Sequence, residues 1–347
     1  MNKNSTYSLL SPSPLVPRTS SFVSRTSYLV PRTSSFVLLL SCFIFASYQA
    51  SAQQELKYTN FIYNYMSINP GYAGSRDVPT ISALYRQQWM GFKGAPVSEV
   101  VSFHSPFLSD RLGIGVNIAN YTIGSTQSQF LSMAYAYSLI HTTDFNVRIG
   151  LQGSMRRIAN NFTDPAEVLI IQNDPAIQNI TPKYLGNFGM GLYVNYRDSY
   201  FGVSVPYYYS NTLGNNNAIT TASERPTYYV MGGVSLPFSD KFYFKPAMLL
   251  QFTQGAPWSA DFNVNFIFND KVGAGLSYRA GKTNFEQIGE SADLLLFYQF
   301  NSQVGFGAAY DFNLSPIKAY QTGSMEVVMR YDLSKPPLAL NNPRTFF

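Results

Sequence analysis

The sequence has little charge and almost no cysteine. Charged residues make up 12% of its 347 residues, about half of the roughly 25% that is usual in a soluble domain. A single cysteine excludes a disulfide scaffold, and a hydrophobic content of 46% excludes a disordered chain. Beyond one N-terminal stretch, no apolar run reaches the roughly 18 to 20 residues of a membrane-spanning helix. The chain therefore folds, but neither as an ordinary soluble domain nor as a helical membrane protein.

Residues 1–52 are typical of a leader that is removed on export. They hold four basic residues and no acidic one, followed by the apolar run FVLLLSCFIFASY (residues 36–48) and by Ala-Ser-Ala before Gln53. A basic region, a short apolar region and an A-x-A site define a signal peptide. We therefore expect cleavage after Ala52.

The leader has two unusual features. The nonapeptide LVPRTSSFV occurs at residues 15–23 and again at 29–37, which we interpret as a duplicated leader or an upstream start codon, because nine residues cannot bury a core. Cys42 lies in a faint lipobox context, but the apolar residues after it continue the signal sequence. Removing the leader takes four positive charges from the net +5 and leaves +1, so a nucleic-acid partner is not expected.

From about Thr80 onward, apolar and polar or small residues alternate in segments of roughly ten residues, the period of a β-strand. In residues 145–156, for example, Val147 and Ile149 alternate with Asn146 and Arg148. About fourteen such segments begin near Thr80, Ser98, Leu112, Ser128, Phe145, Leu185, Tyr200, Thr227, Phe242, Ser259, Val272, Ser291, Val304 and Ser324. An even number of strands with one apolar face predicts an all-β chain, an antiparallel transmembrane β-barrel of outer-membrane type.

The connections alternate as well. After every second segment comes a short polar turn, and these turns lie at residues 109–111, 142–144, 197–199, 239–241, 269–271 and 301–303. The other connections are mostly longer, above all residues 158–184 and 209–225. Short turns on one side and long loops on the other predict a barrel over residues 78–333, with a periplasmic C-terminal tail at 334–347 and both termini in the periplasm.

The polar face of the strands carries charges of both signs. We expect these side chains in the barrel lumen: Arg148, Arg156, Asp261, Arg279, Asp293, Asp311, Glu326 and Arg330. Mixed signs favour an internal network of salt bridges, and a polar ion pathway is the alternative.

No chemistry can be assembled from the sequence. Only His104 and His141 are available, without a cysteine in the mature chain, so neither a metal site nor a nucleophile with its base is predicted. The pairs of glycines in G-x-G spacing lack the third glycine and the following helix of a nucleotide site. We interpret them as small lumen residues that leave room for bulky side chains, a plug or a ligand. Neither an enzyme nor a cofactor is expected.

The segment 53–77 does not alternate, and its Asn69-Pro70-Gly71 indicates a turn, so it is either a plug for the barrel or a periplasmic tether. Five segments carry a family resemblance: YNYMSINPGYAGS (63–75), LYRQQWMGFKGAP (84–96), SFHSPF (102–107), LGIGVNIANYTIGST (112–126) and FGVSVPYY (201–208). They resemble the PorP/SprF family of type IX secretion membrane proteins, although the family has Pro-Ala-Tyr-Ala-Gly more often than the Pro-Gly-Tyr-Ala-Gly found here. The signature residues are Asn69, Pro70, Tyr72, Ala73, Gly74, Tyr85, Arg86, Trp89, Gly94 and Pro96.

This resemblance implies an outer-membrane barrel of the Bacteroidota that binds, helps export or anchors a secreted partner, such as the C-terminal domain of a gliding adhesin. Other type IX secretion components and outer-membrane lipid would be its further partners. The ring-rich stretch VPYYYSN (205–211) suits either a protein interface or the outer aromatic girdle. The alternative function is a channel for small solutes.

Overall fold

The computed structural model describes residues 57–107, 109–160, 182–212, 223–281 and 289–334. The predictions for the signal peptide, for cleavage after Ala52, for most of the long loop at 158–184 and for nearly all of the tail at 334–347 therefore lie outside the described residues.

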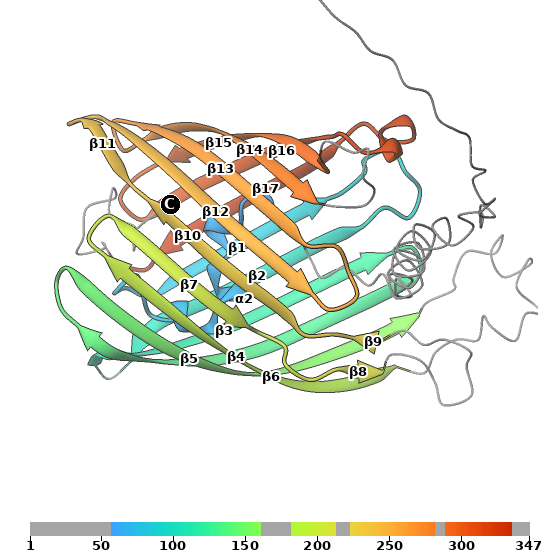
Figure 1. Cartoon of the computed structure of the whole chain (residues 1–347), viewed down its shortest axis with the longest axis horizontal. Coiled ribbons are helices and arrows are strands. Elements are labelled where there is room, and N and C mark those ends of the chain that lie inside the picture. The colour runs from blue at the N-terminus through green and yellow to red at the C-terminus, as the bar shows by residue number, and fades with distance from the viewer. Residues whose placement is uncertain (1–56, 108, 161–181, 213–222, 282–288, 335–347) are drawn as a thin grey trace, which may run out of the picture. The chain divides into compact units, whose positions relative to one another are not determined.

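Antiparallel strands form the wall of a barrel (Figure 1). The first half of the wall consists of β1 (Thr80–Gln87), β2 (Val97–Phe107), β3 (Ser109–Ile123), β4 (Thr126–His141), β5 (Phe145–Asn160), β6 (Lys183–Tyr196) and β7 (Ser199–Val205). The second half consists of β10 (Thr227–Val234), β11 (Leu236–Ser239), β12 (Phe242–Thr253), β13 (Ser259–Phe268), β14 (Val272–Gly281), β15 (Ser291–Gln299), β16 (Val304–Asn313) and β17 (Ser324–Asp332). A separate two-stranded sheet pairs β8 (Asn211–Thr212) with β9 (Ser223–Glu224).

The barrel is closed by the pairings of β1 and of β10. β1 pairs with β17, with Thr80 opposite Asp332, and β10 pairs with both β7 and β12. β10 and β11 both pair with β12 and are separated only by Ser235, so together they occupy one place in the wall. In the described part of the chain this gives a closed antiparallel barrel of fourteen strands, which confirms the fold and the strand number predicted from the alternation.

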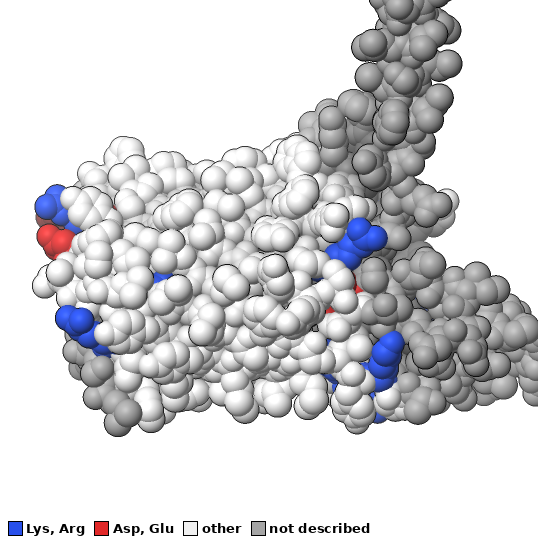
Figure 2. Space-filling view, turned by 60° about the horizontal axis from the view of Figure 1, so that its bottom comes forward, with Lys and Arg blue, Asp and Glu red and all other residues white. Residues whose placement is uncertain are grey.

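Alternate side chains point in opposite directions, as the pattern predicts. On β5, Leu151 is 58% exposed and its neighbour Gln152 is 5% exposed. The outward face is apolar, and the space-filling view in Figure 2 shows a wall that carries blue and red atoms mainly near its two ends. An apolar band bounded by polar ends is the exterior of an outer-membrane barrel.

The two ends of the barrel differ, and we name them the turn end and the loop end. The turn end carries short turns such as residues 142–144 and 269–271. The loop end carries longer connections, among whose described residues are 88–96, 206–212, 223–226 and 314–323, the last with the short helix η3 (Pro316–Ala319). The turn predicted at 109–111 is wrong, because these residues begin β3 and Phe107 already pairs with Ser109. The register shifts beside Pro106, which has no backbone N–H to donate to the ladder.

Residues 57–79, which we call the lumen segment, precede the first strand and lie inside the barrel (Figure 1). They contain three short helices, η1 (Phe61–Tyr63), α2 (Tyr65–Ile68) and η2 (Pro70–Tyr72). Every residue from 58 to 76 except Ser67 is buried. Within the described residues, no helix has the length and apolarity to cross a membrane.

Candidate functional site in the barrel lumen

The lumen segment crosses the barrel from the loop end to the turn end. At its start, Lys57 Nζ lies 2.7 Å from Glu290 Oε2, just before β15 at the loop end. At its other end, Arg76 Nη2 lies 2.8 Å from Asp332 Oδ2, the last residue of β17 at the turn end. Contacts at both ends therefore fix this stretch of about twenty residues along the length of the lumen.

The signature turn begins at Asn69. Its side-chain Oδ1 accepts a hydrogen bond from Gly71 N at 2.8 Å and so caps η2, with Pro70 in the first helical position. The Asn69 amide also donates to the carbonyl of Leu192 on β6 at 2.9 Å. Gly74 then takes a φ of +70°, which an L side chain rarely adopts. The family signature at this point is a compact turn bonded to the wall.

Four lumen glycines, Gly113, Gly150, Gly191 and Gly202, form what we call the glycine patch on β3, β5, β6 and β7. A Cβ at Gly150 would overlap the backbone of residues 70 and 71, and one at Gly113 would overlap the carbonyl of Ala73. At Gly191 and Gly202 a Cβ would meet the side chain of Asn69. The signature turn packs here directly on bare backbone, which explains the small residues that the sequence places on this face.

An aromatic cluster surrounds the turn on its other side. The Tyr65 hydroxyl donates to the Tyr200 hydroxyl at 2.6 Å, and both rings are buried. The Tyr72 ring packs edge-on against Tyr193 at 5.3 Å and against His104 at 5.1 Å between centroids. Burial raises the pKa of Tyr65 well above its usual value, so this phenol is neutral and acts as a donor.

Charged side chains hold the start of the segment at the loop end. Arg86 Nη2 lies 2.5 Å from Asp311 Oδ2, and Arg86 Nη1 lies 3.1 Å from Glu326 Oε2. The same Glu326 accepts the backbone N–H groups of Thr59 at 3.0 Å and Asn60 at 2.7 Å. The Thr59 hydroxyl lies 2.9 Å from both oxygens of Asp311. Both wall carboxylates thus bind Arg86 and the lumen segment at once, Glu326 through backbone N–H groups and Asp311 through the Thr59 hydroxyl.

A second group of charges lies beside the first. Arg279 Nε donates to Asp261 Oδ1 at 2.5 Å, and its Nη2 donates to the carbonyl of Tyr58 at 3.2 Å. Asp293 is buried directly opposite Asp311 in the ladder of β15 and β16. Burial lowers the pKa of Lys57, although its partner Glu290 acts in the opposite direction.

At the turn end, Asp332 binds two basic side chains. Arg76 donates to it through both Nε and Nη2, at 3.1 and 2.8 Å, and Arg330 Nε lies 3.4 Å away. Arg148 Nη1 donates to the carbonyl of Ala73 at 3.0 Å. Arginines therefore hold the signature turn at the turn end, and carboxylates hold the start of the lumen segment at the loop end.

Other predicted residues lie away from the lumen segment. Arg156 pairs with Glu224 at 3.0 Å and lies over the Phe130 ring. Tyr85 is 36% exposed on the outer face of β1. In the first loop-end connection, Trp89 N donates to Ser324 Oγ at 3.2 Å.

The two remaining signature residues fix the backbone of the same connection. Gly94 takes a φ of +75°, and its carbonyl accepts a hydrogen bond from Gly124 N at 2.9 Å. The carbonyl of Pro96 accepts from Gln88 N at 2.9 Å. The signature thus divides into a lumen part (Asn69, Pro70, Tyr72, Ala73, Gly74, Arg86), a loop part (Trp89, Gly94, Pro96) and one wall residue, Tyr85.

Sequence reasoning missed several lumen residues that the structure brings together. Thr59, Arg76 and Asp332 make some of the most buried polar contacts but were not singled out. Lys245 is 1% exposed on β12, and its alternation with Phe244 is a signal that places it on the inner face with Tyr243. Thr59 and Arg76 lie outside any alternating segment, so no pattern marked them. Among the described residues, no three or more His, Cys, Asp or Glu side chains form a group that could hold a metal ion.

Fold and lumen together define an outer-membrane β-barrel whose interior is occupied by its own N-terminal segment. A profile of the type IX secretion system membrane protein family PorP/SprF matches residues 50–331. The chain belongs to this family and to the outer membrane, as its signature segments predict. No functionally curated protein matches the chain.

Several solved structures are similar to this chain. The TodX deltaS2S3 mutant, a monoaromatic hydrocarbon channel, is 10% identical, with a TM-score of 0.47 over 76% of this chain and 92% of that one. The CymD monoaromatic hydrocarbon channel is 10% identical, with a TM-score of 0.46 over 78% and 93%. The Ralstonia pickettii toluene transporter TbuX is 10% identical, with a TM-score of 0.44 over 78% and 92%.

Proposed function

We propose that this barrel binds a secreted partner, such as the C-terminal domain of an adhesin, and helps to export it or anchors it at the cell surface as part of the type IX secretion system. Family membership supports a role in this system. The observation that carries the binding role is the occupied lumen, because residues 58–76 fill it and make both of its ends part of a hydrogen-bonded network. A filled barrel suits a protein anchor better than a diffusion channel, and it needs no enzymatic chemistry.

The proposed orientation follows from the two ends. Short turns of bacterial outer-membrane barrels lie in the periplasm and long loops lie outside the cell, so the turn end faces the periplasm and the exposed apolar wall contacts lipid. The last strand, β17, ends at the turn end. The lumen segment starts at the loop end beside Glu290. The prediction that both termini are periplasmic concerns residues outside the described ranges and stays a prediction.

An aromatic cluster at the loop end is the best partner surface. Tyr208 and Tyr209 are 46% and 55% exposed, and both pack against the Phe188 ring, with centroids 5.2 and 4.7 Å away. Asn187 Oδ1 accepts the backbone N–H groups of all three, at 2.8 to 2.9 Å. Rigid, exposed rings are typical of the centre of a protein interface.

The test is a gene deletion complemented with variants. Deletion should remove the secreted partner from the cell surface, measured by labelling intact cells with an impermeant reagent followed by mass spectrometry. The double variant Tyr208→Ser and Tyr209→Ser should insert normally and still lose the partner. A lipid-facing control, Tyr135→Ser, should keep it. Partners that all remain on the deletion strain would contradict the anchor.

A solute channel is the second candidate, and the same purified protein decides it. Wild-type barrels should neither conduct ions nor let small solutes pass into liposomes, because the lumen segment closes the interior. Open-channel conductance of the intact chain would favour the channel over the anchor.

A further inference from the structure

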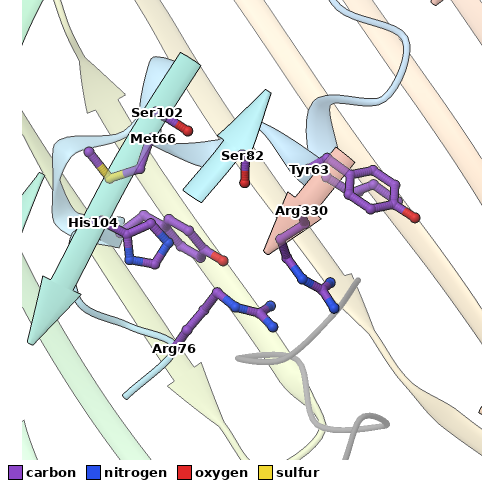
Figure 3. A pocket seen from close by; sticks show the side chains of 9 residues that line it. Tyr63, Met66, Arg76, Ser82, Ser102, His104 and Arg330 are labelled. Atoms are coloured by element: carbon purple, nitrogen blue, oxygen red, sulfur yellow. The ribbon is translucent and has the colours of Figure 1, made fainter. Parts of the chain in front are cut away.

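A small internal cavity lies at the turn end, between the lumen segment and strands β1, β2 and β17. Its volume is about 10 Å³, and nine residues line it: Ile62, Tyr63, Met66, Tyr72, Arg76, Ser82, Ser102, His104 and Arg330. Figure 3 shows the labelled side chains of Arg76, Arg330 and His104 around it. The volume corresponds to about one water molecule. The cavity therefore admits one water molecule or one monatomic ion and excludes a phosphate, a sulfate or a carboxylate.

Arg330 is the charged group with spare donors at this cavity. Its Nη2 donates to Gln299 Oε1 at 3.0 Å, and its Nε lies 3.4 Å from Asp332 without a hydrogen bond. Among the described residues, Nε and Nη1 of Arg330 have no hydrogen-bond acceptor, although the residue is only 2% exposed. A buried cation without its acceptors is costly.

The nearby carboxylate is already occupied. Asp332 accepts two hydrogen bonds from Arg76, at 3.1 and 2.8 Å, and one from the Thr80 hydroxyl at 2.7 Å. Two guanidinium groups therefore share one carboxylate, and the trio keeps a formal charge of +1. The excess positive charge lies on Arg330, which lines the cavity and whose Nη1 has no hydrogen-bond acceptor among the described residues.

The remaining polar lining also offers donors. His104 Nδ1 accepts the backbone N–H of Gly74 at 3.3 Å, so the neutral ring carries its proton on Nε2. Ser82 and Ser102, opposite each other on β1 and β2, contribute hydroxyl groups. None of the nine lining residues is a carboxylate. A cavity with a spare guanidinium, an imidazole N–H and two hydroxyls has the chemistry of an anion site.

We propose that this cavity binds a single monatomic anion of halide size, with chloride as its occupant in the cell. The anion would complete the hydrogen bonds of Arg330 and neutralise the charge left over by Asp332. It would also bridge the lumen segment, through Arg76, to the first two strands and the last strand of the barrel.

The direct test replaces chloride by bromide in the full-length barrel purified from outer membranes. Crystals grown in bromide should show one anomalous peak in the cavity, within hydrogen-bonding distance of Arg330. The absence of bromide density there would overturn the proposal, and water in its place would do the same. This experiment needs no variant, so it stands even if a substitution prevents folding.

The second test measures the midpoint of thermal unfolding in detergent, in chloride and in gluconate at equal ionic strength. Chloride should raise the midpoint of the wild type, since a ligand that binds only the folded state stabilises it. Arg330→Gln should lose this chloride-specific increase. Arg156→Gln, which alters the salt bridge with Glu224, should keep it. Equal midpoints of the wild type in both salts, or an increase retained by Arg330→Gln, would overturn the site.

Discussion

Two stretches of the lumen segment are held by different means. Its start, at Thr59 and Asn60, is bound by the side-chain carboxylates of Asp311 and Glu326. Its signature turn, residues 69–74, rests with its backbone on the glycine patch, where a Cβ at Gly113 or Gly150 would overlap it. One contact is made by side chains that can change rotamer, and the other by backbone that cannot move without shifting whole strands.

The difference between side-chain and backbone contacts indicates which half of the lumen segment can be displaced. Carboxylates can follow a shifted backbone or accept other donors, so the loop-end half tolerates rearrangement at the cost of a few hydrogen bonds. Close-packed backbone has no such adjustment. We therefore expect the signature turn to be the fixed part of the segment and the residues around Lys57 to be the part that yields.

The largest expected effect is a gain of ion conductance when both halves of the lumen segment are removed. Deleting residues 53–77 takes away the buried segment and leaves strands β1 to β17 intact, so the purified barrel should conduct ions in planar bilayers. Deleting residues 53–60 alone should leave the conductance near the wild-type level, because the signature turn remains on the glycine patch. A barrel still sealed after the longer deletion would show that the segment is not what closes the lumen.

A smaller but severe effect is expected from the glycine patch. Gly150→Val places side-chain atoms where the backbone of residues 70 and 71 lies, which should cost more than the roughly 1–3 kcal/mol of ordinary overpacking. Gly153→Val on the same strand is the matched control, since nothing lies within 4 Å of a Cβ there. The folded fraction is measured by the mobility of unheated samples on gels. Equal folding of the two variants would contradict the tight packing.

The carboxylate contacts should contribute to stability without being required for folding. Glu326→Ala leaves the Arg86 guanidinium with one carboxylate and the N–H groups of Thr59 and Asn60 without an acceptor, and should lower the free energy of unfolding by about 3–5 kcal/mol. The exposed Glu99, which accepts from Asn120 at 2.9 Å, is the control, and Glu99→Ala should change it by about 0.5 kcal/mol or less. Urea titrations of both variants in lipid vesicles measure the difference. Similar losses for the two would show that burial does not matter at Glu326.

The smallest effect is expected at Lys57. Its salt bridge with Glu290 is partly accessible, with side-chain exposures of 11% and 22%, so Lys57→Ala should reduce stability by about 1 kcal/mol or less. The same urea titration measures it. A loss as large as that of Glu326→Ala would mean that the start of the segment is as firmly fixed as the turn.

The wall of the barrel could be predicted from the sequence because each strand has two different faces. The apolar outer face and the polar inner face require residues such as Ile149 and Arg148 to alternate, and this period is visible without any tertiary information. The turn at 109–111 was misplaced because polar residues there looked like a turn. Strand β3 in fact begins at Ser109, and the register shift beside Pro106 could not be read locally.

The lumen contacts could be predicted only in part. Arg279 and Asp311 could be predicted because they lie at polar positions of alternating segments, two residues apart from other inward-facing positions. The segment's own residues follow no period, since short helices joined by turns pack against several strands at once. Which strand each residue meets is decided by the closure of the barrel. Asn69, for example, meets Leu192, which is 123 positions away, and no local pattern records such a pairing.

The seam between the first and last strands has a further consequence for assembly. Joining β1 to β17 closes the longest loop in the chain, and the entropy cost of such closure rises with loop length. Hydrogen bonds of the N-terminal region reach across to β17: Arg76 binds Asp332, and Arg86 and the backbone N–H groups of Thr59 and Asn60 bind Glu326. The N-terminal region therefore carries the groups that bind the last strand, and we expect it to act as an internal template on which the cylinder is completed.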